Sequence, residues 1–202
     1  MDETGSIGMA LMDFLPVIAF LAGIVFLVMT ARLLKAGLCQ WLFTISGALI
    51  FLGGLLQATW KFLFFCDICD YRWMSNAQFI LMGPGFLLFL IAVILLSQQT
   101  QPTKGLPLLI MAPWKIPLLA VMTLSSLAAY GLLAVIAFRK KLPVAFAGFL
   151  LALLGVLAMG FLASRPQTIS MQWLEQSVNT GANIAFAVGC HQIFRWQKAR
   201  AN

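Results

Sequence analysis

Residues 142–164 read LPVAFAGFLLALLGVLAMGFLAS and contain no Asp, Glu, Lys or Arg. A helix of about 20 apolar residues is long enough to cross the roughly 30 Å of hydrocarbon in a bilayer. Strands of a membrane barrel would be about ten residues long and would alternate apolar with polar residues. This stretch is longer and uniformly apolar, so it predicts a membrane-spanning helix.

Similar uncharged runs recur along the whole chain. Hydrophobic residues make up 62% of the 202 positions and charged residues 9%, against about 25% charged in an ordinary soluble domain. The sequence therefore predicts an all-α, polytopic transmembrane helical bundle that forms a single integral membrane domain over residues 1–202. About six spans are expected, near residues 10–34, 38–62, 75–97, 115–138, 143–163 and 170–195.

The charges are placed as in a membrane protein. The net charge is +7, but the Lys and Arg residues stand singly or in short groups beside the ends of apolar runs. Such charges set topology and meet anionic lipid headgroups, whereas a nucleic-acid footprint needs a basic face. Membrane lipids are therefore the expected partners, with partner membrane subunits or further copies of the chain as candidates, and nucleic acid is not expected.

An even number of spans places both termini on one side of the membrane. Residues 1–6 carry Asp2 and Glu3 and no basic residue, so they lack the positive region of a cleavable secretory signal. We expect a multi-pass protein of the plasma (inner) membrane with both termini cytoplasmic, because this orientation puts the larger share of basic residues inside. The residues placed inside are Lys61, Arg72, Arg139, Lys140, Lys141, Arg195, Lys198 and Arg200. Those placed outside are Arg32, Lys35, Lys104, Lys115 and Arg165.

A weak internal repeat relates the two halves of the chain. Phe14-Leu15-Pro16 opens one apolar run and Lys115-Ile116-Pro117 another, and each is followed by a short basic turn, a second run, a longer polar loop and a third run. Three helices per half would make the repeats inverted, a pattern found in several transporters. The proline-rich segment between the halves, residues 97–117, is expected to be an interfacial loop or a re-entrant segment.

The last predicted helix carries a polar stripe. At about 100° per residue, the side chains of Gln176, Asn179 and Asn183 fall on one face with Glu175 at its edge, and Gly181, Ala185 and Gly189 lie nearly opposite. Lipid offers no hydrogen-bond partners to amides, so the stripe should face the bundle interior. There the amides would either form hydrogen bonds between helices or line a binding site. The candidate binding residues are Glu175, Gln176, Asn179, Asn183, Asn76 and Gln78, the last two preceding a Gly83-Pro84-Gly85 break expected to kink its helix.

Cysteines supply a second candidate site. Cys66 and Cys69 form a Cys-x-x-Cys, a spacing that fits a disulfide, half of a metal site, a redox pair or two unpaired structural cysteines. In a six-span bundle they would lie on the same side as Cys190 and His191, the only histidine of the chain. These four residues are therefore a candidate Cys3His metal site, with zinc as the metal.

Three functional classes remain open at this level. A protein that binds or translocates a small solute, ion or lipid is favoured by the polar stripe of the last helix. A structural or assembly subunit of a larger membrane complex is favoured by the short loops, and a membrane-embedded thiol-redox or metal-dependent enzyme by the cysteines. No phosphate-binding glycine loop or nucleophile elbow is present in the sequence, so an enzyme is the less favoured class.

Overall fold

The computed structural model describes residues 3–66, 68–100, 116–162, 164–165 and 168–201. Within these residues the chain is helical and has no strand, which confirms the predicted helical bundle. A short helix α1 (Glu3–Met12) leads into six long ones. These are α2 (Phe14–Leu33), α3 (Gly37–Phe65), α4 (Arg72–Thr100), α5 (Ile116–Arg139), α6 (Pro143–Leu162) and α7 (Ile169–Ala201).

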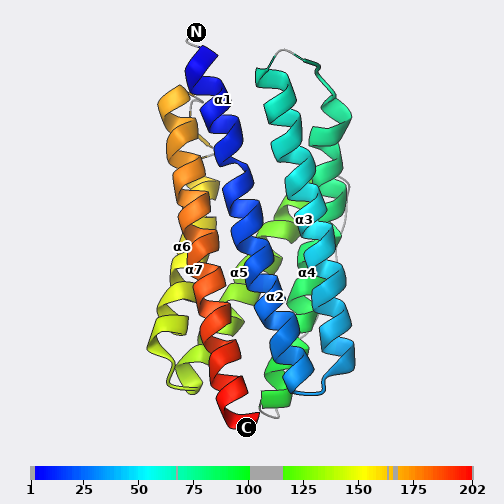
Figure 1. Cartoon of the computed structure of the whole chain (residues 1–202), viewed down its shortest axis with the longest axis vertical. Helices are drawn as coiled ribbons and strands as arrows, with labels where there is room; N and C mark the ends of the chain where they lie inside the picture. The colour runs from blue at the N-terminus through cyan, green and yellow to red at the C-terminus, as the bar shows by residue number, and fades with distance from the viewer. Residues whose placement is uncertain (1–2, 67, 101–115, 163, 166–167, 202) are drawn as a thin grey trace.

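The six long helices pack as a closed ring. Each contacts the next along the chain, and α7 returns to pack along α2, which closes the ring (Figure 1). Helix α1 is separated from α2 only by a turn at Asp13 and packs mainly on α3. The ring encloses the buried core, so the apolar outer faces are left for lipid.

Five helical stretches are long and apolar enough to cross a membrane: Gly8–Leu33, Gly37–Phe65, Arg72–Gln98, Ala120–Arg139 and Pro143–Leu162. Helix α7 has 33 residues but is more polar than these five, because it carries the stripe of amides. Its amides are turned into the ring rather than toward lipid, which is the arrangement expected for polar groups at membrane depth. The chain is thus a multi-pass integral membrane protein.

Neighbouring helices α4 and α5 run in the same direction. The ring centroids of Phe89 in α4 and Tyr130 in α5 are 6.4 Å apart. About two helical turns further along each helix, Leu96 and Ile136 line the same small pocket. Helices α2 and α7 are parallel in the same way. As a result α1 begins at one end of the bundle and α7 finishes at the other (Figure 1), so the prediction that both termini lie on one side is wrong.

The two halves are related by a parallel repeat, not the inverted one expected. Both α2 and α5 end in a hairpin whose lysine, Lys35 or Lys141, has a positive φ of 53° or 57°. In the first hairpin the N–H of Ala36 donates to the carbonyl of Ala31, and in the second that of Leu142 donates to Ala137. These bonds are typical of an α-helix that ends with one residue in the left-handed conformation. The same turn is therefore built twice, in the same orientation.

Burial follows the same repeat. The residues of α2 that are buried in the ring have buried counterparts in α5 at the same distance before the hairpin, and this holds for the start of α3 and α6 too. The corresponding pairs are Phe20 and Ser126, Ile24 and Tyr130, Leu27 and Leu133, Thr30 and Ile136, Ala31 and Ala137, Cys39 and Ala145, and Phe43 and Phe149. Together with the ring order, this gives a pseudo-two-fold axis along the bundle.

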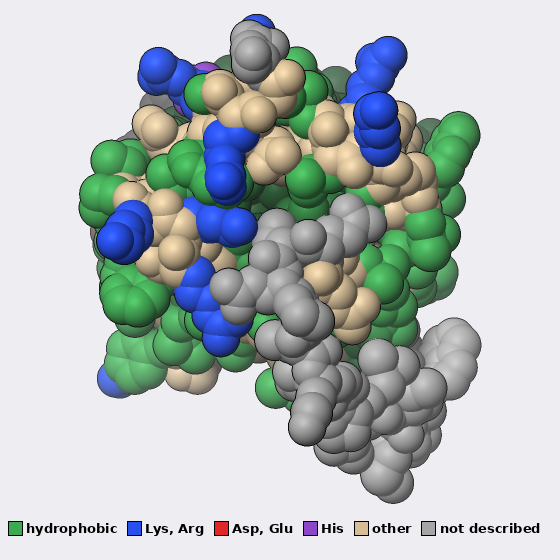
Figure 2. All heavy atoms as spheres, turned by 90° about the horizontal axis from the view of Figure 1, so that it is seen from below, with side chains coloured by type: hydrophobic (Ala, Val, Ile, Leu, Met, Phe, Trp, Pro, Cys, Tyr) green, Lys and Arg blue, Asp and Glu red, His purple; other side chains and the backbone are tan. Residues whose placement is uncertain are grey.

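Charge separates the two ends of the bundle. Seen from the end where α7 finishes, the molecule shows many Lys and Arg side chains and no Asp or Glu (Figure 2). The basic residues at this end are Arg32, Lys35, Arg139, Lys140, Lys141, Arg195, Lys198 and Arg200. We call it the basic end. Among residues whose side chains are described, the carboxylates lie toward the other end, at Asp13, Asp70 and Glu175.

Close helix contacts depend on small residues, but not on all those expected. A Cβ added at Gly148 of α6 would lie 2.6 Å from the backbone oxygen of Ala185, and one at Gly189 would lie 2.9 Å from the Phe149 ring. Gly181 is exposed and would meet nothing. The expected small-residue contact of α7 is therefore made by Ala185 and Gly189 against α6, without Gly181.

The structure describes one of the two proline-containing segments for which a change of chain direction was predicted. Helix α4 continues through Pro84, so the Gly83-Pro84-Gly85 sequence does not end the helix. Most of the proline-rich segment between the halves, residues 101–115, lies outside the described residues. The expectation of an interfacial or re-entrant segment there stays a prediction.

The direction of the helices predicts the topology. We expect a reporter fused before Met1 and one fused after Asn202 to report opposite sides of the membrane, because α1 begins at one end of the bundle and α7 finishes at the other. Accessibility of tags at the two ends, in intact and permeabilised cells, measures this. Equal accessibility of both tags would contradict the ring as described.

The Gly148 contact predicts a localised packing cost. Gly148→Ala should destabilise the protein by about 1–3 kcal/mol, because the new methyl group meets a backbone oxygen that moves only with α7. Gly160→Ala, on the same helix, should be close to neutral since nothing lies within 4 Å of its Cβ position. Thermal unfolding of both variants in detergent measures the difference, and an equal effect would show that α6 and α7 are less closely packed.

Candidate functional site

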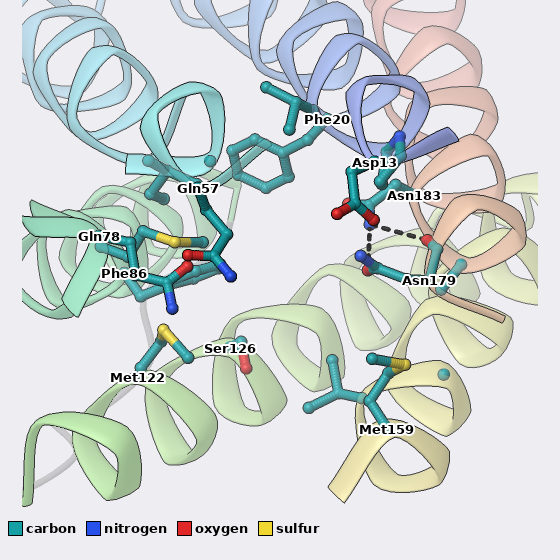
Figure 3. Close-up of a pocket in the computed structure, with 18 of the residues that line it drawn as sticks. Asp13, Phe20, Gln57, Gln78, Phe86, Met122, Ser126, Met159, Asn179 and Asn183 are labelled. Carbon is teal, nitrogen blue, oxygen red and sulfur yellow. Dashed lines mark hydrogen bonds between the residues drawn. The ribbon is translucent and has the colours of Figure 1, made fainter. Parts of the chain in front are cut away.

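A cavity of about 520 Å³ lies inside the ring. All six long helices line it, together with Asp13, and it occupies the half of the bundle away from the basic end. In Figure 3, Asp13, Asn179 and Asn183 form one wall, while Gln57, Gln78 and Phe86 face them. Ligand pockets in proteins are typically about 300–1,000 Å³, mainly apolar, with a few placed polar groups. This cavity has that size and that lining.

An aromatic layer closes the cavity toward the basic end. Each long helix contributes one buried ring to it, and neighbouring centroids are 5.2–6.4 Å apart, from the stacked Phe20–Phe186 pair to the edge contact of Phe89 with Tyr130. The members are Phe20, Phe43, Phe89, Tyr130, Phe149 and Phe186, all 4% exposed or less. Such rings fill the bundle axis, so the cavity is separated from the basic end by packed side chains.

The polar stripe of α7 lies on the cavity wall, as its periodicity predicts. Glu175, Gln176, Asn179 and Asn183 all line the cavity. The side-chain amide of Asn183 donates to both the backbone and the side-chain oxygen of Asn179, each at 2.9 Å. These two amides therefore stabilise one another along the helix and hold one edge of the wall. Whether the stripe binds a ligand stays a prediction.

Of the two α4 candidates, only one reaches the cavity. Gln78 lines it, whereas Asn76 is exposed and lies outside it. The residues that line the cavity follow the repeat. In α4 they precede the buried ring of Phe89 by the same numbers of residues as those in α7 precede the buried ring of Phe186. Those of α4 are Gln78, Phe79, Met82 and Phe86, and those of α7 are Glu175, Gln176, Asn179 and Asn183. One half thus supplies a mostly apolar wall and the other a polar wall.

A buried ion pair at the cavity was not foreseen from the sequence. Asp13 lies at the turn between α1 and α2 with its side chain 6% exposed, and its Oδ2 is 2.7 Å from Nζ of Lys61 on α3. Each residue borders an uncharged run and so resembles an ordinary flanking charge. The order of the apolar runs did contain a signal for this pair. In two antiparallel neighbours such as α2 and α3, the start of the first helix lies beside the end of the second, and these are the places of Asp13 and Lys61.

Three acceptor oxygens on the cavity wall lack a hydrogen-bond partner among the described residues. They are Oδ1 of Asp13, Oε1 of Gln57 and Oε1 of Gln176, and they come from three parts of the ring. Buried polar atoms in proteins are nearly always hydrogen-bonded, so each exception needs a reason. All three residues line the cavity, so these oxygens are the candidate acceptors for whatever occupies it.

The proposed Cys3His site is not formed. Cys66 and Cys69 follow α3 at the end away from the basic residues. Cys190 is buried beside the aromatic layer, and the His191 ring packs at a tilt against Phe26, with the ring centroids 4.8 Å apart. The described residues contain no group of three or more His, Cys, Asp or Glu able to hold a metal. The prediction failed because it assumed that successive helices alternate in direction, whereas α4 and α5 are parallel. Cys66 and Cys69 are both free thiols, with no bond between them.

Comparisons with known proteins give no relative. No family model matches the sequence, and neither curated proteins nor solved structures match it. The function has to be inferred from the cavity itself.

An exposed ion pair outside the bundle offers a reference for the buried one. Asp70, in the loop between α3 and α4, accepts a bond from Nε of Arg72 at 2.9 Å and from Nε1 of Trp60 at 3.1 Å. The bond from Arg72, followed by that from Trp60, lowers the pKa of Asp70 below its usual value. A lowered carboxyl pKa means that these contacts are complete above the ordinary pKa of Asp and are lost as pH falls.

The two pairs predict different costs of removing the cation. Lys61→Met should destabilise the protein by about 3 kcal/mol, because it leaves the buried carboxylate of Asp13 unpaired. Arg72→Met should have a much smaller effect on stability, since solvent reaches both members of the Asp70–Arg72 pair. Thermal unfolding of both variants at neutral pH measures this. If the two substitutions cost the same, the Asp13–Lys61 pair is hydrated and not buried.

Proposed function

We propose that this protein binds a small solute in the ring cavity and carries it across the membrane. The main support is the pairing of a cavity of about 520 Å³ with three partnerless acceptor oxygens on its wall. A subunit that served only as a scaffold would gain stability if that space were filled with side chains, because a cavity costs packing energy. A binding protein needs the space.

The position of the cavity between repeats also supports transport. In many transporters, with inverted or with parallel repeats, the substrate site lies near the bilayer midplane at the interface of the two repeats. Here the cavity is lined by equivalent positions of the two halves, and one end of it is closed by the aromatic layer. Separation of the halves at that layer would open the cavity toward the basic end, and closure at the other end would complete alternating access.

The charge distribution supports one orientation. Cytoplasmic ends of membrane proteins are enriched in Lys and Arg, and eight of the described Lys and Arg residues gather at the basic end. The proposal therefore puts the basic end, with the C-terminal residues, in the cytoplasm of a cell whose plasma (inner) membrane holds the protein. The cavity then lies in the outer half of the bilayer, and its solute is taken from or released to the outside.

The metal-dependent form of the enzyme hypothesis loses support. A metal-dependent enzyme needed the four Cys and His residues in one place, and they are apart.

The binding hypothesis has a specific test, because Asn179→Leu removes an amide from the cavity wall. Ser177→Leu is the matched control, because Ser177 is an exposed polar residue of the same helix.

We expect a solute that binds the wild type to raise its unfolding temperature. Asn179→Leu should weaken that solute's affinity roughly 10- to 100-fold, as loss of a buried hydrogen bond costs about 1–3 kcal/mol. Ser177→Leu should bind normally. A thermal-shift screen of small solutes, followed by uptake into proteoliposomes, provides the measurement. If Asn179→Leu only lowers stability while binding and uptake are unchanged in the folded fraction, the amides are structural and the site is elsewhere.

A further inference from the structure

The partnerless atoms on the cavity wall share one property. Oδ1 of Asp13, Oε1 of Gln57 and Oε1 of Gln176 all accept hydrogen bonds, and among the described residues none of the buried partnerless side-chain atoms is a nitrogen. The nearby amide nitrogen of Asn183 is already used by two oxygens of Asn179. An occupant that completes this wall must therefore supply donors.

Asp13 carries the most weight among the three acceptors. A glutamine amide can turn over and exchange its oxygen for its nitrogen, but an ionised carboxylate is an acceptor at every lone pair. The Asp13 side chain is more than nine-tenths buried and points into the cavity beside the Asn179–Asn183 pair (Figure 3). A buried carboxylate is costly unless charge and hydrogen bonds compensate it. Its free oxygen is thus the strongest unfilled acceptor of the site.

Lys61 compensates Asp13 only in part. Its Nζ approaches Oδ2 and leaves Oδ1 without a bond, and the lysine side chain remains 30% exposed. An anionic group placed at Oδ1 would meet the carboxylate of Asp13 directly and would be repelled by it. Oδ1 therefore disfavours an anionic partner.

We propose that the solute of this cavity is an organic monocation with a protonated amine, whose ammonium group donates to Oδ1 of Asp13. This proposal rests on the proposed function and names the class of its solute. The apolar part of the solute would lie against Phe86, Met122 and Met159, which line the cavity around the polar wall. Lys61 is then a tethered competitor, because its ammonium already occupies the other oxygen of the same carboxylate.

Three probes of one size and different charge test the class without any variant. The full chain in lipid nanodiscs is heated at neutral pH and equal ionic strength with n-butylammonium, n-butanol or butyrate. We expect butylammonium to raise the unfolding temperature saturably. Butanol should bind roughly tenfold more weakly or worse, because a hydrogen bond to a charged group is about twice as strong as a neutral one. Butyrate should give no saturable rise.

Three variants locate the effect. Asp13→Asn should abolish the rise caused by butylammonium, whereas Asp70→Asn, which removes an exposed carboxylate outside the cavity, should keep it. Lys61→Met should raise the affinity for butylammonium roughly tenfold, because the competing ammonium is gone. The added amine should also restore part of the stability that Lys61→Met loses, and this rescue is readable even if that variant is only marginally folded.

The outcomes separate the solute class from the function. Equal or stronger stabilisation by butanol or butyrate would overturn the monocation, and so would a butylammonium effect that survives Asp13→Asn. In those cases binding of some other solute, lost in Asn179→Leu, would leave the proposed function in place. If butylammonium has no effect on the wild type or on Lys61→Met, the amine class is wrong. The proposed function fails as well only if no solute of any charge binds.

Discussion

The architecture depends on the inability of lipid to hydrogen-bond polar side chains. Helix α7 carries amides at several successive turns, and hydrocarbon would leave each of them unsatisfied. The helix therefore has to turn that face inward and pack its small residues on α6. Asn179 and Asn183 line the cavity, so in this half the ring closes around a space and not around a solid core.

The halves of the repeat have diverged in a way that suits binding. They keep the same hairpins, the same buried positions and the same order around the ring. They differ at the cavity, where α4 presents Met82 and Phe86 at places equivalent to Asn179 and Asn183 of α7. A site with one apolar and one polar wall orients an amphipathic occupant, which two identical walls could not do.

The sequence predicted the elements well because each depends on a local property. Uncharged runs located the helices, and a step of 100° per residue placed the stripe of Gln176, Asn179 and Asn183 on one face, where the structure has it. The relative direction of helices is not local. Six apolar runs predict helices of alternating direction if every connection is a turn, but α4 and α5 are parallel. For this reason the predictions for the termini, the inverted repeat and the metal site are wrong. The Asp13–Lys61 pair was missed since it requires knowing which helix ends meet.

The parallel repeat has a consequence for how the molecule could change shape. With inverted repeats, the two halves can exchange conformations and thereby produce the opposite-facing state from the same two local structures. An axis along the bundle does not relate its two ends, so that exchange would regenerate the original state. Any state open at the basic end must therefore have contacts of its own, and residues such as Thr30, Leu96 and Ile136, now packed together there, would need a second set of neighbours.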